Sequence, residues 1–531
     1  MKVADRRLGL VAIFATAAAF AYLAQGPSSP SLAHYALVKS LAQGTAVIDE
    51  TRYQTGEQQA YDISYFEGHY YANKAPGLAF VVLPAYLALD AVGVRSGGDP
   101  DPMLWALGVV GAVLPATLLL LLVRAVGERF EPGFGTAAAV TLGLGTLLTT
   151  FAAVFFPHAL SAFLVFAAFA LLLTERRGAP RLLLVGGAGL VTGYAITSEY
   201  HNVFGALVLG LYALARARWL ERGLVYAAGV VAGAIPLPLY NLWAFGSMTH
   251  LSYEGAVLKT GTSGHDVQLQ VDEALGVPHF STLVSLLLSR WGLLTAAPVL
   301  ALGVAGAVLL YRRGNRAEAL VVAGIGSAYV VYNAAFFDPF GSVPPGPRYL
   351  LPLLPFVAAP LALAYRAFPL PTAVLASGSV SLACAVTATR PHIAWDGDVL
   401  FRLAHPSWWS PTLADLLGIG AWYRVLPLLA AFGVALACAV LATPWPSPAR
   451  RELLGAGLAF AGWIAVATQG WRLLESKGLG RPFGPLLLLC GVLLLAAAVA
   501  LLLRPRNLSR SRSKRRRARR ARSSSRLRPP R

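Results

Sequence analysis

Long apolar runs recur along the whole sequence, and they decide what kind of fold this chain can form. A membrane-crossing helix needs about 20 mainly apolar residues, and backbone groups in lipid must hydrogen-bond within their own segment. The runs lack the period-two alternation of β-barrel strands, so the sequence predicts an all-α polytopic membrane protein. The runs lie at residues 8–24, 76–95, 104–125, 134–150, 155–174, 182–198, 202–217, 222–240, 291–310, 317–337, 349–366, 369–389, 421–441, 453–471 and 484–503.

The first apolar run, Leu8 to Ala24, follows the basic residues Lys2, Arg6 and Arg7. This pattern also fits a cleaved signal peptide, because the run ends in a sequence that resembles a cleavage site. A polytopic protein needs a first span to set its orientation, so we favour an uncleaved span. Basic residues before that span indicate a cytoplasmic N-terminus.

Basic loops between the later runs orient the rest of the chain, because such loops stay in the cytoplasm. All of them fall inside only if one of the runs 76–95 and 104–125 does not cross the membrane, and we choose 76–95, which contains Pro84 and Asp90. This orientation predicts about 14 transmembrane helices and cytoplasmic ends in a multi-pass plasma-membrane protein. The polar motifs then all become extracytoplasmic. The basic groups are Arg124 with Arg129, Arg176 with Arg177, Arg216 with Arg222, Arg312 with Arg316, Arg450 with Arg451, and the C-terminal tail.

The net charge of +19 has its main source in the last 28 residues of the chain. Residues 504–531 contain 14 Lys and Arg and no acid, a composition that predicts a disordered cytoplasmic tail. It is held on anionic lipid or is a solvated topology anchor, and nucleic acid is the least favoured partner. The three cysteines fall in or beside apolar runs and have no metal-binding spacing.

The densest polar cluster lies at residues 61–74, at the end of a predicted extracytoplasmic first loop, 26–75. We expect residues 32–41 in this loop to form an amphipathic helix on the membrane surface. Asp49 or Asp62 is the candidate general base for an attacking hydroxyl, while a solvated loop acid is the alternative for each. Within the same cluster, His69 and Tyr71 are candidates for positioning a substrate.

Two cations stand beside Gly/Pro-rich turns at predicted membrane entries. Lys74 precedes Ala75-Pro76-Gly77, and Arg348 follows the Gly/Pro run 341–347. Each side chain could bind a lipid phosphate, or it could extend its charged end to the membrane surface without a functional role.

Glu199 and His201 lie between two predicted spans, where ionisable side chains usually face a cavity. They are candidates for positioning a sugar or an acceptor, and two ligands are too few to predict a metal site. His158 follows Pro157 and is interpreted as a helix-start residue.

Five sequence blocks resemble, in this order, those of the bacterial membrane glycosyltransferases of the C-type fold: HYALVKSLAQGTAVID, YDISYFEGHYYANKAPG, PHALSAFLVF, YNLWAFGS and GPRYLLPLLPF. The group includes protein mannosyltransferases and the lipid A aminoarabinose transferase. The resemblance covers residues 1–366, which it marks as a catalytic region. A C-terminal transmembrane region, 367–503, and the tail 504–531 carry none of these blocks.

The resemblance implies an enzyme that transfers a sugar from a polyprenyl-phosphate donor to a glycan, lipid or protein acceptor at the outer face of the membrane. It implies a catalytic acid in the first loop, Asp62 or Asp49, and phosphate contacts from Lys74 and Arg348. Family members commonly carry an acid soon after the first span, and residues 26–48 contain none.

Two other functions remain as alternatives: a transporter or lipid-linked sugar flippase, and a non-catalytic scaffold for envelope synthesis. A transporter would need ionisable groups at mid-membrane, and the predicted spans largely lack them. No cofactor is specified by the sequence.

Overall fold

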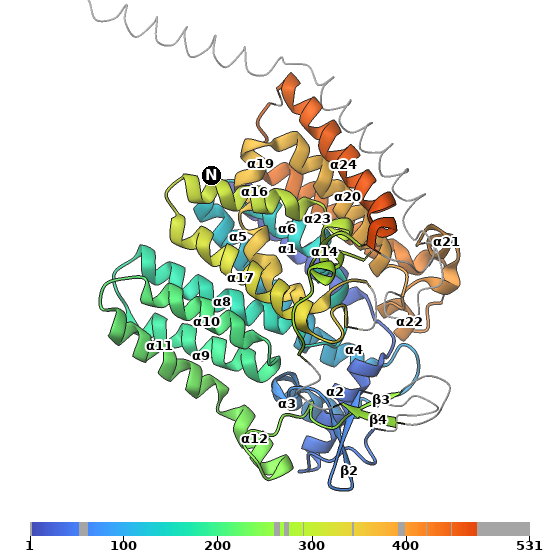
Figure 1. Cartoon of the computed structure of the whole chain (residues 1–531). Coiled ribbons are helices and arrows are strands. Elements are labelled where there is room, and N and C mark those ends of the chain that lie inside the picture. The colour runs from blue at the N-terminus through green and yellow to red at the C-terminus, as the bar shows by residue number, and fades with distance from the viewer. Residues whose placement is uncertain are drawn as a thin grey trace, which may run out of the picture.

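The computed structural model describes residues 3–52, 62–259, 266–269, 275–289, 291–341, 345–390, 399–420, 422–447 and 449–474. The predicted span 484–503 and the basic tail 504–531 lie outside these ranges. Within them the chain is mainly helical, as predicted, and Figure 1 shows one helical bundle with α2, α3 and the strands at one end and α19 and α24 at the other.

The helices have these bounds: α1 (Val3–Tyr22), α2 (Ser29–Ala42), α3 (Gly77–Ala91), α4 (Pro102–Gly108), α5 (Leu114–Phe130), α6 (Gly135–Leu144), α7 (Leu148–Phe151), α8 (His158–Arg177), α9 (Leu182–Ser198), α10 (Asn202–Leu214), α11 (Trp219–Ala234), α12 (Pro236–Phe245), α14 (Phe280–Leu288), α15 (Leu293–Ala296), α16 (Val299–Arg312), α17 (Arg316–Ala335), α18 (Leu354–Ala358), α19 (Leu361–Ala367), α20 (Pro369–Thr387), α21 (Val399–Ala404), α22 (Leu413–Leu416), α23 (Leu426–Ala442) and α24 (Arg450–Leu474). A short π-helix, Val109–Val113, joins α4 to α5, and 3₁₀-helices cover Arg348–Leu353, Pro406–Trp408 and Trp422–Val425.

Six helical segments among the described residues are long and apolar enough to cross a membrane, or up to eight if each of two bent helix pairs forms one span. The predicted number of about fourteen is therefore not confirmed. Several apolar runs form helices too short to cross a hydrocarbon core of about 30 Å: α6 has 10 residues and α10 has 13, and a helix rises about 1.5 Å per residue. Run 76–95, expected not to cross, forms the 15-residue α3.

A small antiparallel sheet departs from the all-α prediction. Its strands are β1 (Ile63–Phe66), β2 (His69–Ala72), β3 (Ala256–Lys259) and β4 (Asp266–Leu269), in the order β2-β1-β3-β4. The β1–β2 hairpin pairs Ile63 with Ala72 and Phe66 with His69. Glu67 and Gly68 both have positive φ, the backbone that a two-residue hairpin turn requires. The sheet joins the first loop to a segment almost 200 residues later in the chain.

Helix α2 contains the stretch 32–41, and its burial inside the protein departs from the exposed amphipathic helix that we expected, whereas its place relative to a membrane stays a prediction. Ten of its 14 residues are buried, including His34 and Leu37. The stretch is apolar on more than one face, so α2 packs into the protein against α3 and β2.

Helices α9 and α11 pack with their backbones in close contact. A Cβ atom added at Gly193 would lie 2.1 Å from the Val230 carbonyl oxygen, and one at Gly233 would lie 2.0 Å from the Leu190 oxygen. Small residues at a spacing of four let membrane helices approach in this way. The contact fixes α9, and therefore Glu199, which follows its last residue.

Several of the basic loops are held by ion pairs to two acids, Glu175 and Glu131. Glu175 is fully buried and accepts hydrogen bonds from Arg222 at 2.6 and 2.9 Å and from Arg216 at 3.1 Å. Glu131 pairs with Arg313 and Arg366. The Glu175 contacts join the end of α8 to the α10–α11 turn and the start of α11, and the Glu131 contacts join the C-terminal ends of α5, α16 and α19. Which face of a membrane these ends occupy stays a prediction.

Candidate active site

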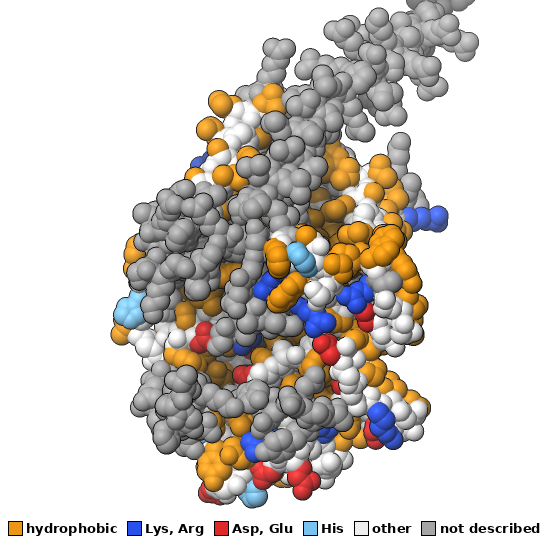
Figure 2. Space-filling view, turned by 90° about the vertical axis from the view of Figure 1, so that its right-hand side faces the viewer, with side chains coloured by type: hydrophobic (Ala, Val, Ile, Leu, Met, Phe, Trp, Pro, Cys, Tyr) orange, Lys and Arg blue, Asp and Glu red, His pale blue; other side chains and the backbone are white. Residues whose placement is uncertain are grey.

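One cavity of about 380 Å³ brings together residues from distant parts of the chain. Its wall is formed by segments from six places: α2, the turn before α3, the start of α8, the α9–α10 turn, α17 and the 3₁₀-helix Arg348–Leu353. Four of the residues predicted from the sequence line it: Lys74, Glu199, His201 and Arg348. In Figure 2, charged side chains gather in the middle and lower parts of the view.

Asp62 lies behind Lys74 and is not part of the cavity lining. Its Oδ1 accepts a hydrogen bond from Lys74 Nζ at 2.9 Å, and its Oδ2 accepts one from Ser29 Oγ at 2.5 Å. Burial alone would raise the pKa of Asp62, but the Lys74 charge, these two hydrogen bonds and the nearby Arg348 together lower it. Asp62 is therefore an ionised group that holds the Lys74 ammonium at the cavity wall.

Lys74 is also joined to the α9–α10 turn. The Ser252 hydroxyl donates to the Lys74 carbonyl oxygen at 2.8 Å and lies 2.6 Å from the Tyr200 hydroxyl. Gly77 approaches the end of α9 so closely that an added Cβ would lie 2.7 Å from Ser198 N and Cα. Only glycine fits there without displacing one helix, so the turn that carries Lys74 is fixed against the turn that carries Glu199.

Arg348 is buried at the start of its 3₁₀-helix, with 6% of its surface exposed. Its guanidinium lies 5.7 Å from the Phe156 ring centroid and 5.3 Å from that of Tyr349. A Cβ at Gly341 would meet its Nε at 2.4 Å. No carboxylate in the described part of the chain lies within ion-pair distance of Arg348, which leaves a buried cation facing the cavity.

Glu199 pairs with a residue that the sequence analysis did not assign to the site. His158 Nδ1 lies 2.6 Å from Glu199 Oε1, and their side chains are 5% and 8% exposed. Burial alone would raise the pKa of Glu199, but His158 and His201 lower it well below its ordinary value. His158 is indeed the first residue of α8, as expected. The sequence offered no signal for its partner, because Glu199 lies on another helix end.

Two further histidines line the cavity without hydrogen bonds on their buried ring nitrogens. Both nitrogens of His34 and Nε2 of His201 are of this kind. Burial, followed by the Lys74 charge, lowers the pKa of His34 to about 3, and burial lowers that of His201 to about 4. Both are neutral at pH 7, and His201 stacks on Tyr332 with 5.5 Å between ring centroids.

Besides Asp62, three residues predicted for the site lie outside the cavity lining. Asp49 accepts a hydrogen bond from Tyr70 N at 2.7 Å and pairs with the exposed His69, so this acid fixes the β1–β2 hairpin. Tyr71 is buried against Phe245, 4.8 Å away between ring centroids. Spacing within the first loop suggested one cluster, whereas alternate strand residues point to opposite sides of the hairpin.

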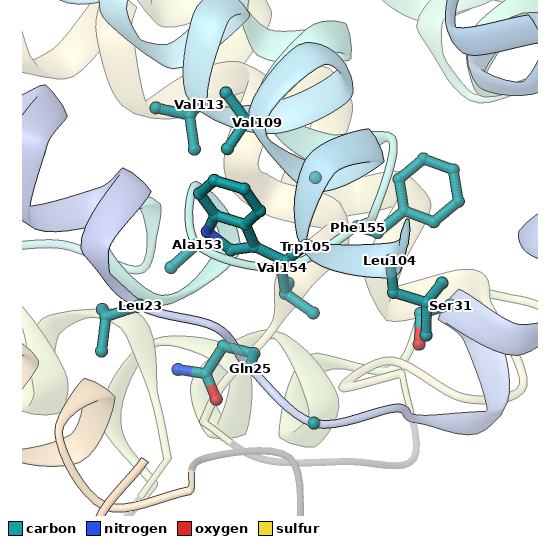
Figure 3. A pocket seen from close by; sticks show the side chains of 12 residues that line it. Leu23, Gln25, Ser31, Leu104, Trp105, Val109, Val113, Ala153, Val154 and Phe155 are labelled. Atoms are coloured by element: carbon teal, nitrogen blue, oxygen red, sulfur yellow. The ribbon is translucent and has the colours of Figure 1, made fainter. Parts of the chain in front are cut away.

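No group of three or more potential metal ligands occurs among the residues that the structure describes. Figure 3 shows a different pocket, of about 10 Å³, beside Leu23, Gln25 and Trp105. Its lining, all within the described ranges, has no Asp, Glu, His, Lys or Arg, and it has room for about one water molecule. Four of the residues predicted for the site line the cavity of about 380 Å³, and none of them lines this pocket.

No protein-family model and no curated protein sequence matches this chain. Among solved structures, it is similar to ArnT from Cupriavidus metallidurans in the apo state, with 17% identity and a TM-score of 0.43 over 86% of this chain and 76% of that one. It is also similar to the Archaeoglobus fulgidus oligosaccharyltransferase AglB in complex with an inhibitory peptide and a dolichol-phosphate, with 13% identity and a TM-score of 0.41. That match covers 90% of this chain and 60% of that one, and the apo form gives a TM-score of 0.40 at 12% identity.

Both similar proteins are glycosyltransferases of the C-type fold, the group that the sequence blocks resemble. Identities and TM-scores are low, so the function proposed below rests on the residues of this chain.

Proposed function

We propose that this chain is a membrane glycosyltransferase that moves a sugar from a polyprenyl phosphate to an acceptor at the outer face of the plasma membrane. The observation that carries the proposal is the convergence of Lys74 and Arg348, far apart in the sequence, on one cavity that also holds Glu199 and His201. Phosphate at this place would give Arg348 the counter-charge that a buried charge needs, and it would approach Lys74, which is already paired with Asp62.

The two cations have different roles. Arg348 has no carboxylate partner among the described residues, and its planar guanidinium suits two phosphate oxygens at once. Lys74 is already hydrogen-bonded to Asp62 at 2.9 Å, so its ammonium group supplies a positive charge at a fixed position in the cavity wall. Together they stabilise the negative charge that develops on the departing phosphate, and no general acid is then needed to protonate it.

The remaining lining suits a small polar group more than a long glycan. A volume of about 380 Å³ is at the lower end of the range for small-molecule sites, about 300–1,000 Å³. The rings of Tyr332 and Tyr349 lie beside His201, and Phe336 packs against Tyr349. We assign to Glu199 and His201 the role of binding hydroxyl groups of the sugar or the acceptor. Whether the acceptor is a glycan, a lipid or a protein would depend on contacts outside the cavity.

Of the two candidate acids, Asp62 takes part in the site as the partner of Lys74, and Asp49 does not. Asp62 touches Lys74, whereas Asp49 is committed to the hairpin. While Asp62 is ionised, it holds Lys74 in place. It could accept a proton from a substrate only by releasing Lys74 or Ser29.

The test is binding of undecaprenyl phosphate to the purified full chain, measured with Arg348→Ala, Lys74→Ala and Arg366→Ala variants. Arg366 is the matched control, because it is 58% exposed and pairs with Glu131 at 3.2 Å, outside the cavity lining. We expect both cavity variants to weaken binding at least tenfold and the control to bind as the native chain does. Equal binding by all four proteins would refute the phosphate site, and uptake of the lipid into closed vesicles without sugar transfer would favour a flippase.

A further inference from the structure

His158 and Glu199 form a buried dyad, and the binding of phosphate by Lys74 and Arg348 gives this dyad no role. Nδ1 of His158 lies 2.6 Å from Glu199 Oε1, and both residues line the cavity. A carboxylate on Nδ1 holds an imidazole in one orientation and one tautomer, with the lone pair on Nε2. A ring held in this way is able to accept a proton from a group in the cavity.

Other groups near the cavity are less suited to accept a proton. Asp62 has one oxygen on Lys74 and the other on Ser29. Within the described chain, His34 and His201 have no carboxylate bonded to a ring nitrogen. His158 is therefore the lining histidine with the partner that a general base requires.

The surroundings of His158 also place it close to the phosphate-binding cations. Its ring lies 5.9 Å from the Tyr349 ring, next in sequence to Arg348. Five titratable or charged groups interact with it electrostatically: His34 on α2, Lys74 before α3, Glu199 and His201 in the α9–α10 turn, and Arg348 in the 3₁₀-helix.

We propose that His158 is the general base of the transfer reaction and that Glu199 is its positioning residue, an inference that rests on the proposed function. The attacking hydroxyl oxygen forms a bond to the anomeric carbon of the sugar, and the bond from that carbon to the phosphate oxygen breaks. The bonding electrons leave with the polyprenyl phosphate. The hydroxyl proton moves to His158 Nε2, which gives an imidazolium beside the Glu199 carboxylate.

Water can replace the unknown acceptor in the test, because the same base would activate it. The full chain is incubated with undecaprenyl phosphate that carries tritiated mannose, glucose or arabinose, and release of free sugar is measured against pH. For His158→Ala we expect a loss of about 10²- to 10⁴-fold, the usual contribution of a general base. We also expect the rise of rate with pH to disappear and added imidazole to restore both. Glu199→Gln should keep part of the rate with a displaced pH profile, and His405→Gln, an exposed histidine bonded to the Phe401 carbonyl oxygen, should match the native chain.

The outcomes separate this inference from the proposed function. A His158→Ala protein with the native rate and pH profile overturns the base assignment, while sugar release sensitive to Arg348→Ala would keep the enzyme. A folded His158→Ala protein that loses activity without rescue by imidazole makes the histidine structural and also overturns it. If the native chain binds none of the three donors and releases no sugar, both proposals are wrong.

Discussion

Replacing Gly193 by alanine tests whether the close contact between α9 and α11 holds the site together. The new Cβ would lie 2.1 Å from Val230 O and 2.8 Å from Ala234 N, both backbone atoms. An ordinary contact begins at 3.4 Å, so the helices must separate locally by about 1.3 Å. Overpacking of this kind destabilises by about 1–3 kcal/mol, and the better helix propensity of alanine offsets about 0.5–1 kcal/mol of it. We expect a net loss of about 1–2 kcal/mol.

The same helix provides a matched control. An added Cβ at Gly187 meets nothing closer than Leu171 Cδ1 at 3.9 Å. Gly187→Ala should therefore stabilise the protein by about 0.5–1 kcal/mol, so the two variants are predicted to change stability in opposite directions. Thermal and denaturant unfolding of the full chain in detergent would measure both.

Sugar release from labelled undecaprenyl-phosphate donors adds a second measurement to this pair. Because Glu199 directly follows α9, separation of the helices should also lower the rate for Gly193→Ala and leave it unchanged for Gly187→Ala. If Gly193→Ala is as stable and as active as Gly187→Ala, the helix contact does not position Glu199 and the reasoning fails.

Three more predictions follow from the same contacts. Because the pKa of Asp62 is lowered in the folded chain, its ion pair stabilises the fold fully above the unfolded pKa of about 3.9. This stabilisation is lost as pH falls through the folded pKa, so the melting temperatures of the native and Asp62→Asn chains should converge only in strong acid. A difference in melting temperature that stays constant with pH would exclude the ion pair as the cause of that difference. Arg348→Lys should bind undecaprenyl phosphate several-fold more weakly than the native chain in a direct binding assay, because an ammonium cannot match the bidentate fork; full binding would show that charge alone suffices. Arg222→Ala should lower the unfolding free energy by about 3–5 kcal/mol, since Glu175 would stay buried without its bidentate partner, and folded Arg222→Ala protein should bind the lipid normally; a small loss in unfolding free energy would show that Arg216 alone compensates.

The sequence predicted the parts of this site that depend on a short motif. Lys74 stands directly before a Pro-Gly turn, and Arg348 directly after a Gly/Pro run, so each was recognisable from its own neighbours. The sequence could not predict that both line one cavity, because this depends on how α3, α9 and the 3₁₀-helix pack. It is the close approach of Gly77 to Ser198 that brings the first of these turns against α9.

The residues missed or misplaced are those whose role depends on a partner elsewhere in the chain. His158 is at a helix start by sequence, and only the fold brings Glu199 to its Nδ1. Asp49 has the residue type of a base, but the hairpin engages it through the Tyr70 amide. The predicted number of spans is not confirmed for a related reason, because hydropathy does not show where an apolar run breaks, as between α6 and α7.

The cavity pairs each charge that the proposed reaction would create with an opposite charge already in place. Cleavage of the sugar–phosphate bond adds one negative charge to the phosphate, beside Lys74 and Arg348. The proton released by the hydroxyl would add one positive charge to His158, whose Nδ1 is 2.6 Å from Glu199. In a buried site such fixed partners stabilise developing charge without reorganisation of solvent. This arrangement explains why a cavity with two cations also holds a buried carboxylate: Glu199 stabilises the imidazolium, and Asp62, outside the lining, holds Lys74 in place.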